Sequence, residues 1–483
     1  MSEQPFRLRQ GGLIDRRARL AFTFDGKRYD GHPGDTLASA LLANGVRLVG
    51  RSFKYHRPRG LVAAGTAEPN ALMQIGAGDR DTPNIPATTV QLCDGLSARS
   101  QNRWPSLRFD VQSVNGLLKP FFPAGFYYKT FMWPAAFWEK LYEPLIRRSA
   151  GLGRATTDAD PDRYERGHLH CDLLVVGGGP AGLTAALAAG RGGARVVLAS
   201  DDFRFGGSLL GEVVELDRQP AVRWVDAVVA ELERLPNVRL LPRTTVFGYY
   251  DHNVLAAVET VGEAAPQPEA QRARERLWKI EAARVILAAG AFERPIAFPG
   301  NDRPGVMLAS AVRTYIHRYA VCPGERAVVF ANNDDGFATA RDLAVAGAEV
   351  TLVDARPEAK LPAALRGLGI DVKPGRRIVG TRGRLLVESC ALDDGDDLTC
   401  DLIAVAGGWN PAVHLSSQTG VKPVWDDVAQ CFVPGTPRQG EVSAGACAGR
   451  FTTAEALTGG WRAAAAALEA LGRGAAEVAL PQP

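Results

Sequence analysis

Hydrophobic and polar positions alternate in two different ways along the chain. Residues 19–25 alternate as in a half-buried strand, residues 26–31 follow as a turn and a return strand, and residues 37–43 form an apolar helical stretch. From Leu173 onward, short apolar strands alternate instead with helical stretches, which is the pattern of a doubly wound α/β fold. The sequence therefore predicts a hairpin and a helix ahead of a larger α/β part.

The strongest local signal is the segment CDLLVVGGGPAG, in which an apolar strand meets Gly177-x-Gly179-x-x-Gly182 and a helix follows. The first glycine allows a tight turn, the second lets a pyrophosphate approach the backbone, and the third lets helix and strand pack closely. The helix N-terminus then presents free N–H groups and a positive dipole end to the phosphate. This context favours a dinucleotide site over a plain tight turn.

Acidic residues follow the second strand of this unit, residues 195–200. Asp201 comes 19 residues after Gly182, close to the position where a carboxylate binds the adenosine ribose, and Ser200 and Asp202 flank it. A solvated turn is the alternative, but the upstream glycines favour ribose contact for Asp201.

A second Rossmann-type unit is predicted to begin at residues 327–330, after an apolar strand at 285–291 that leaves the first unit. Its turn, ANNDDG (331–336), lacks two of the three glycines. The side chains of Asn333 and Asp334 hinder a close approach to the backbone. We expect the fold to be kept and pyrophosphate binding to be lost, so a reductase site for NADPH is not expected.

The chain is expected to return to the first unit at residues 402–411 and 442–449. Flavoproteins of this fold usually carry Gly-Asp in the latter segment, and that Asp holds the flavin ribityl chain. Here the pair is Gly445-Ala446, which argues against FAD in an extended pose and is compatible with NAD in the same groove. The Ala-rich closing helix, 461–471, needs no functional role.

The N-terminal hairpin, helix and Gly/Pro-rich loop resemble the β-grasp of plant-type ferredoxins, which place Cys-x4-Cys-x2-Cys in the loop to hold a [2Fe–2S] cluster. In this chain the three ligand positions fall on Ala63, Glu68 and Ala71. We therefore expect a ferredoxin-like scaffold without its cluster. Cys93 stands alone and is expected to be a buried thiol.

Residues 104–170 form a connecting region. Its segment FFPAGFYYKTFMWP (121–134) is crowded with aromatic residues, and further aromatics follow up to Tyr142. These rings either fill a seam between domains of this chain or are buried against a partner subunit, where such residues are enriched. Residues 156–170 are polar and are expected to form a surface linker.

Composition narrows the class of protein further. The 483 residues, 46% hydrophobic and 23% charged, suit a soluble globular chain of several domains. A net charge of +3 without a dense basic stripe makes a nucleic-acid partner unexpected. The 7 cysteines include no CxxC pair, so we expect neither a metal site nor a disulfide framework. We expect no membrane span, and a cytoplasmic location with reduced thiols.

The expected fold class is α/β, a two-dinucleotide-binding Rossmann-type fold preceded by a ferredoxin-like β-grasp without an iron–sulfur cluster. The expected domains are the β-grasp (1–103), the connecting region (104–170), an NAD-binding domain (171–294 plus 402–475) and a second Rossmann-like domain (295–401).

The chain resembles the α subunit of heterotetrameric sarcosine oxidase and its relatives over about its whole length. The runs that carry this resemblance occur in the family's order: FKYHRPRG (53–60), PAGFYYKT (123–130), EPLIRR (143–148), AFERP (291–295), VFANND (329–334) and GGWNP (407–411).

The resemblance implies that NAD is bound noncovalently in the FAD-like groove, with Ser200 standing where the family commonly has Asp. It assigns no catalytic residue and no metal ligand to this chain. Together with the glycine turn, it predicts these cofactor-binding residues: Gly177, Gly179, Pro180, Ala181, Gly182, Ser200, Asp201, Asp202, Gly207, Ser208, Val246, Ala289, Gly290, Ala446, Phe451 and Thr453.

The resemblance also implies a division of labour. In such complexes the amine is oxidised on a β subunit that carries FAD, FMN lies at the α–β interface, and electrons pass on to dioxygen or another acceptor. This chain would supply half of the FMN pocket, and further small subunits are possible.

The basic cluster of Lys54, His56, Arg57 and Arg59 either meets a phosphate or is an exposed basic loop, and the loop is favoured.

Long family members continue into a folate-binding, aminomethyltransferase-like domain, whereas this sequence stops at Pro483 and is a short subunit or a fragment. Shorter relatives include subunits of opine oxidases and of hydroxyproline or proline dehydrogenases. Sarcosine is therefore one option among secondary amines and imino acids.

Two other classes of function stay open: a self-sufficient FAD-dependent NAD(P)H oxidoreductase, and a noncatalytic assembly subunit in which NAD is structural.

Overall fold

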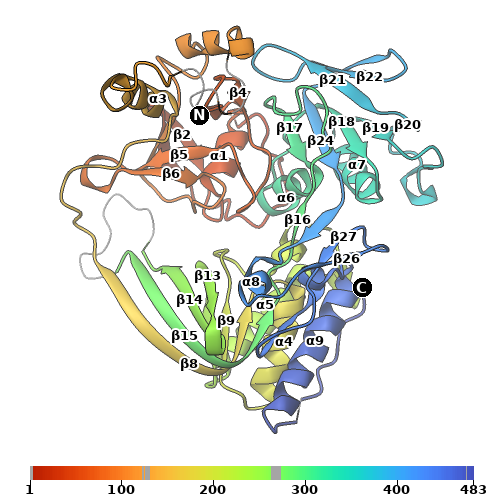
Figure 1. Cartoon of the computed structure of the whole chain (residues 1–483). Coiled ribbons are helices and arrows are strands. Elements are labelled where there is room, and N and C mark those ends of the chain that lie inside the picture. Colours follow the sequence, from red (N-terminus) through yellow and green to blue (C-terminus); the bar gives the residue numbers. More distant parts are fainter. Residues whose placement is uncertain (1–3, 122–124, 126–130, 263–272, 475) are drawn as a thin grey trace. The chain divides into compact units, whose positions relative to one another are not determined.

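The computed structural model describes residues 4–121, 125, 131–262, 273–474 and 476–483 (Figure 1). The chain divides into two compact units. Unit 1 comprises residues 1–161, 264–266 and 295–407, and unit 2 comprises residues 162–263, 267–294 and 408–483. Within the described residues, no helix combines the length and the apolar character that crossing a membrane requires.

The N-terminal part of unit 1 is a five-stranded sheet in the order β2-β1-β7-β5-β6. Its strands are β1 (Leu20–Phe24), β2 (Lys27–Gly31), β5 (Leu72–Ile75), β6 (Thr82–Pro86) and β7 (Leu96–Ser100). Thr36 caps the buried helix α1 (Leu37–Ala43) in a capping box with Ser39. The predicted hairpin and helix are confirmed.

The second part of unit 1 is a parallel sheet in the order β17-β24-β18-β19-β20. Its elements are β17 (Val306–Leu308), α6 (Ala309–Tyr319), β18 (Arg326–Ala331), α7 (Asp335–Val345), β19 (Glu349–Asp354), β20 (Asp371–Pro374) and β24 (Leu402–Ala406). An antiparallel sheet of β21 (Ile378–Arg382), β22 (Ser389–Leu392) and β23 (Asp397–Thr399) belongs to the same unit.

The predicted return to the nucleotide domain at residue 402 is wrong, because β24 pairs with β17 and β18 in unit 1. All five residues of this strand are apolar and buried. Such a run fits the middle of any parallel sheet, so its own pattern does not reveal which sheet it joins. The chain enters unit 2 only at residue 408.

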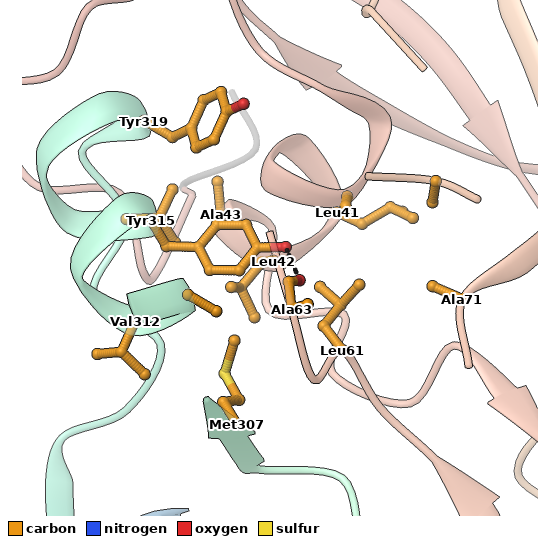
Figure 2. Close-up of a cluster of buried hydrophobic side chains, with 14 of the residues drawn as sticks. Leu41, Leu42, Ala43, Leu61, Ala63, Ala71, Met307, Val312, Tyr315 and Tyr319 are labelled. Carbon is orange, nitrogen blue, oxygen red and sulfur yellow. Dashed lines mark hydrogen bonds between the residues drawn. The ribbon is translucent and has the colours of Figure 1, made fainter. Parts of the chain in front are cut away.

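The two parts of unit 1 share one hydrophobic core, and Figure 2 shows its centre. Tyr315 of α6 is fully buried there, and its hydroxyl donates a hydrogen bond to the carbonyl oxygen of Ala63 at 3.1 Å. The side chains that meet around it are Leu41, Leu42, Leu61, Ala71, Met307, Val312 and Tyr319. The expected domains 1–103 and 295–401 are thus packed as one body rather than as two independent domains.

Unit 2 is built on a sheet in the order β12-β9-β8-β15-β14-β13, with β28 paired to β15. Its strands are β8 (Tyr164–Val176), β9 (Val196–Ala199), β12 (Val238–Leu241), β13 (Thr244–Tyr250), β14 (Val254–Thr260), β15 (Glu275–Leu287) and β28 (Glu441–Ser443). Its helices include α4 (Pro180–Arg191), α5 (Ala221–Arg234) and α9 (Thr453–Ala470), and α4 lies beside α9 (Figure 1).

Residues 164–170 are not part of a linker, as the sequence analysis expected. They form the first half of the 13-residue strand β8, which pairs in parallel with β15 along its length. Their side chains are mostly exposed and polar, so they resemble a loop in sequence. The backbone partner that makes them a strand lies about a hundred residues away in the chain.

Smaller elements complete the units. Unit 1 contains β3 (Gly50–Arg51), β4 (Pro58–Arg59) and α3 (Glu143–Ser149). Unit 2 contains β10 (Glu215–Leu216), β11 (Gln219–Pro220), β16 (Ala291–Glu293), β25 (Trp409–Pro411), α8 (His414–Gln418), β26 (Val424–Asp426) and β27 (Cys431–Val433). Most of the aromatic segment 121–134, including the run 123–130 apart from residue 125, lies outside the described residues.

Replacing Tyr315 tests the shared core. Tyr315→Ala should lower the free energy of unfolding by about 3–5 kcal/mol, because it removes a large buried ring. Tyr315→Phe should cost only about 1 kcal/mol through the lost hydrogen bond. Thermal and urea unfolding of the full chain measure both effects. Phe109→Ala, at an exposed ring of the same unit, is the control, and an unchanged transition for Tyr315→Ala would contradict the shared core.

Candidate dinucleotide-binding site

The glycine turn between β8 and α4 gives each of its three glycines a different environment. Gly177 has φ +109°, and an added Cβ would overlap the carbonyl oxygen of Ala288. A Cβ on Gly182 would overlap the carbonyl oxygen of Gly177, so α4 packs directly on the turn. A Cβ on Gly179 would meet only the Cα of Gly207, at 3.8 Å. The chain itself requires the first and third glycines, whereas space is left beside the second.

The first turn of α4 is arranged to hold an anion. Gly179 is its N-cap and makes no side-chain capping bond, and Pro180 occupies the first helical position. The first N–H groups of an α-helix have no partner within the helix and carry the positive end of its dipole. A pyrophosphate placed over Gly179 would therefore find donors in the backbone of Ala181 and Gly182.

Ser200, Asp201 and Asp202 follow the carboxyl end of β9. Ser200 is buried and held through its backbone, which bonds Leu241 at 3.0 Å and Thr244 at 2.7 Å. Asp202 accepts a side-chain hydrogen bond from the N–H of Arg204 at 3.1 Å. The side chain of Asp201 is open to solvent, yet the surrounding protein and the charge of Asp202 raise its pKa. Asp201 therefore stays a candidate acceptor for a ribose, as the sequence predicts.

Other predicted residues gather at the same end of the sheet. A Cβ on Gly207 would lie 2.7 Å from the Cα of Gly179, and one on Gly445 would lie 2.8 Å from the Cβ of Ala181. The predicted residues Ser208 and Ala446 directly follow these two glycines. Ala289 and Gly290 come just after β15, and Gly290 has a positive φ of +75°. Val246 lies on β13, while Phe451 and Thr453 lie where α9 begins.

Helix α9 borders this site, although no functional role was expected for the closing helix 461–471. The helix begins at Thr453, earlier than the expected residue 461, behind a capping box of Thr452 and Glu455. A Cβ on Gly460 would overlap the carbonyl oxygen of Ala181, so α9 packs against the start of α4. The signal was the Gly459-Gly460 pair within an Ala-rich helix. Close helix packing is a common reason for such a glycine.

The corresponding turn of the second Rossmann-type fold, in unit 1, is filled by its own side chains. The side-chain amide of Asn333 donates to the carbonyl oxygen of Ala406 at 3.1 Å, and its oxygen accepts the N–H of Asp335 at 3.0 Å. Arg356 donates to Asp334 at 2.7 Å and to Asp354 at 2.8 Å. The groups that would receive a phosphate at the start of α7 are therefore engaged within the chain.

The basic cluster at residues 54–59 is more than an exposed loop, which corrects the favoured interpretation. His56 is buried, and its Nδ1 lies 2.7 Å from Oδ2 of Asp110. Arg57 and Arg59 both pair with Asp302, at 3.2 and 2.6 Å. Burial would raise the pKa of Asp302, but these two charges outweigh it and hold the pKa below the usual range. Much of the cluster's charge is thus bound internally.

No group of three or more His, Cys, Asp or Glu residues within the described ranges could hold a metal ion. The seven cysteines, Cys93 among them, are buried thiols. Burial raises the pKa of the Cys447 thiol to about 11, and that of the Cys322 thiol also to about 11. Neutral thiols of this kind are poor nucleophiles.

Two protein families match the chain. Residues 17–103 match the 2Fe-2S iron-sulfur cluster binding domain, and residues 171–430 match the pyridine nucleotide-disulphide oxidoreductases. The second match covers more than half of the chain, so the protein belongs to the pyridine nucleotide-disulphide oxidoreductase family.

The curated relatives that match the chain include sarcosine oxidase α subunits. The chain is 51% identical to sarcosine oxidase subunit alpha of Rhizobium meliloti (strain 1021) over 454 residues, 92% of this chain and 45% of the relative. It is 40% identical to that of Corynebacterium sp. (strain P-1) over 477 residues, 95% of this chain and 44% of the relative. These matches confirm the resemblance inferred from the sequence. The chain spans about half the length of these relatives.

A solved structure shows the same fold over nearly the whole chain. L-proline dehydrogenase from P. horikoshii superposes with a TM-score of 0.66 and 18% identity, covering 98% of this chain and 77% of that one.

Alanine substitutions should separate the roles of the two helix glycines. Gly182→Ala should destabilise unit 2 by roughly 3 kcal/mol, because its methyl group overlaps the backbone of Gly177. Gly179→Ala should leave the fold nearly unchanged, because its methyl group meets open space. Thermal unfolding followed by circular dichroism measures both. Equal losses of stability would contradict the open space beside Gly179.

Proposed function

We propose that this chain is an α-type subunit of a multisubunit, flavin-dependent amine oxidase or dehydrogenase. It binds NAD at the glycine turn of unit 2 and contributes to an FMN site shared with a partner. The partner, a β subunit with FAD, oxidises a secondary amine or imino acid such as sarcosine. Further small subunits are compatible with this arrangement. The homology to sarcosine oxidase subunit alpha supports the class of complex.

The open space beside Gly179 carries the nucleotide part of this proposal. A methyl group there would touch only one neighbouring Cα, whereas Gly177 and Gly182 are packed against the backbone. Nothing in the internal packing demands a glycine at position 179. Close approach of a pyrophosphate to the helix N-terminus does demand one.

Ala446 favours NAD over FAD as the occupant. It follows Gly445, which packs against Ala181 in the first turn of α4, so it borders the nucleotide turn. Its methyl group offers no acceptor for ribityl hydroxyls, where related flavoproteins place a carboxylate. The filled turn around Asn333 also counts against a self-sufficient reductase that would need a second nucleotide.

A set of exposed apolar side chains in the connecting region of unit 1 supports a partner subunit. Within the described part of the connecting region, Trp133 is 84% exposed and Leu117 is 81% exposed. Large apolar and aromatic side chains are enriched at protein–protein interfaces, so their exposure along one region of the chain fits a segment that a partner covers. Other exposed apolar residues of this region are Trp104, Phe109, Val111, Val114, Leu118, Met132, Phe137, Leu141, Leu145 and Leu152. We assign this set of side chains to the interface with the flavin-bearing partner.

The function is tested in the assembled complex. The chain is coexpressed with its flavin-bearing partner as wild type, as Gly179→Val and as the control Gly474→Val. Gly474 is exposed, and an added Cβ there would meet no atom within 4 Å. We expect all three to assemble, and only Gly179→Val to lose the nucleotide and at least about tenfold of sarcosine or proline turnover. Normal turnover by an assembled Gly179→Val complex would favour a structural NAD in an assembly subunit. No amine oxidation by the wild-type complex would contradict the proposed function.

The raised pKa of Asp201 predicts a pH dependence of nucleotide binding. Only the carboxylate accepts hydrogen bonds from both ribose hydroxyls, so affinity should fall as the pH drops through a value above the usual Asp range. Asp201→Asn should bind about tenfold more weakly at neutral pH and lose this dependence. Calorimetric titration of nucleotide-depleted protein with NAD measures both. If the affinity of Asp201→Asn for NAD still falls at low pH, a group other than Asp201 causes the pH dependence.

A further inference from the structure

The loop that follows β4 is organised around one buried carboxylate. Glu68 is 4% exposed, and its two oxygens accept four backbone N–H groups. Oε2 accepts from Val62 at 2.7 Å and Ala63 at 2.8 Å, while Oε1 accepts from Asn70 at 2.7 Å and Ala71 at 3.1 Å. The donors come from both sides of the loop, so the carboxylate joins its two ends.

This loop stands where the matched family holds its iron–sulfur cluster. Residues 17–103 match the 2Fe-2S cluster binding domain, and the Cys-x4-Cys-x2-Cys spacing places ligands at residues 63, 68 and 71. Ala63 and Ala71 carry methyl groups with no atom that could bind iron. Glu68 has a possible ligand, but its oxygens are already bonded to the loop's own N–H groups. The residues present do not fit the cluster.

Converging backbone N–H groups form a concavity that favours an anion, and many iron–sulfur sites use such a concavity. A loop that lost its cluster but kept its shape would leave these donors buried without acceptors, at a cost of about 1–3 kcal/mol each. We propose that the carboxylate of Glu68 takes the place of the anionic cluster, holding the ferredoxin-like loop in its cluster-binding shape while closing the site. The domain is then a structural module that carries no electrons.

The packing around the loop agrees with a closed site. The side chains of Leu61, Ala63 and Ala71 are buried in the core shared with α6, and the Tyr315 hydroxyl bonds the carbonyl oxygen of Ala63 (Figure 2). Burial and the neighbouring Glu68 charge raise the pKa of Tyr315, so it remains a neutral donor. The hydroxyl of Thr88 also donates a 2.8 Å hydrogen bond to the carbonyl oxygen of Gly65 within the loop.

The first test uses the wild-type chain, which is incubated anaerobically with ferric iron and sulfide and then desalted. We expect less than one iron per chain and no visible absorption band. Two irons and two sulfides per chain, with a charge-transfer band, would overturn the proposal. This measurement does not depend on any variant folding, nor on the function proposed above.

The second test removes the charge of Glu68 and measures the hydrogen exchange of the loop's backbone amides. Glu68→Gln keeps the size of the side chain but replaces an acceptor oxygen by an N–H₂ donor that faces the loop. We expect exchange at the amides of residues 62, 63, 70 and 71 to accelerate about tenfold or more. The control is Glu441→Gln in unit 2, where another buried carboxylate accepts the N–H groups of Arg438 and Gln439. The amides of residues 62, 63, 70 and 71 should exchange at the wild-type rate in Glu441→Gln. Unchanged exchange of these amides in Glu68→Gln, or equal acceleration of the same amides in Glu441→Gln, would overturn the role of the carboxylate.

Discussion

The close approach of helix α4 to the turn after β8 is the constraint on which the candidate site depends. Gly182 lies so near the carbonyl oxygen of Gly177 that no side chain fits between them. Gly460 of α9 and Gly445 pack closely against Ala181, which lies in the same first turn of α4. The strand β8 stands between β9 and β15, where the chain crosses from one side of the sheet to the other. Ligands of doubly wound folds bind at this switch point, and here three glycines, Gly182, Gly445 and Gly460, allow the close contacts of the first turn of α4.

The same physical need recurs at three loops of the chain, which meet it in different ways. In each loop, backbone N–H groups point toward a common place, where they require an acceptor or water. At the ferredoxin-like loop, Glu68 supplies the acceptor, and at the second Rossmann-type turn Asn333 does. At Gly179 no side chain caps the helix, so an external anion can bind. Our proposal of one nucleotide site within the described residues follows from these three contrasts, because side chains occupy the other two loops.

Local patterns predicted the parts of the fold whose causes are local. The hairpin, α1 and the turn from Gly177 to Gly182 rest on neighbouring residues, and the structure contains them. The first half of β8 and the sheet that β24 joins depend on distant partners, so local patterns misplaced them. The role of Glu68 was hidden for the same reason, since its four N–H partners converge only once the loop has folded. The signal available in sequence was a carboxylate at a ligand position.

The central claim is that unit 2 holds one NAD at the Gly179 turn. The most direct measurement is the mass of the nucleotide released when the purified full chain is denatured. We expect the mass of NAD and a colourless protein without a flavin absorption band. Release of FAD from a yellow chain would contradict it.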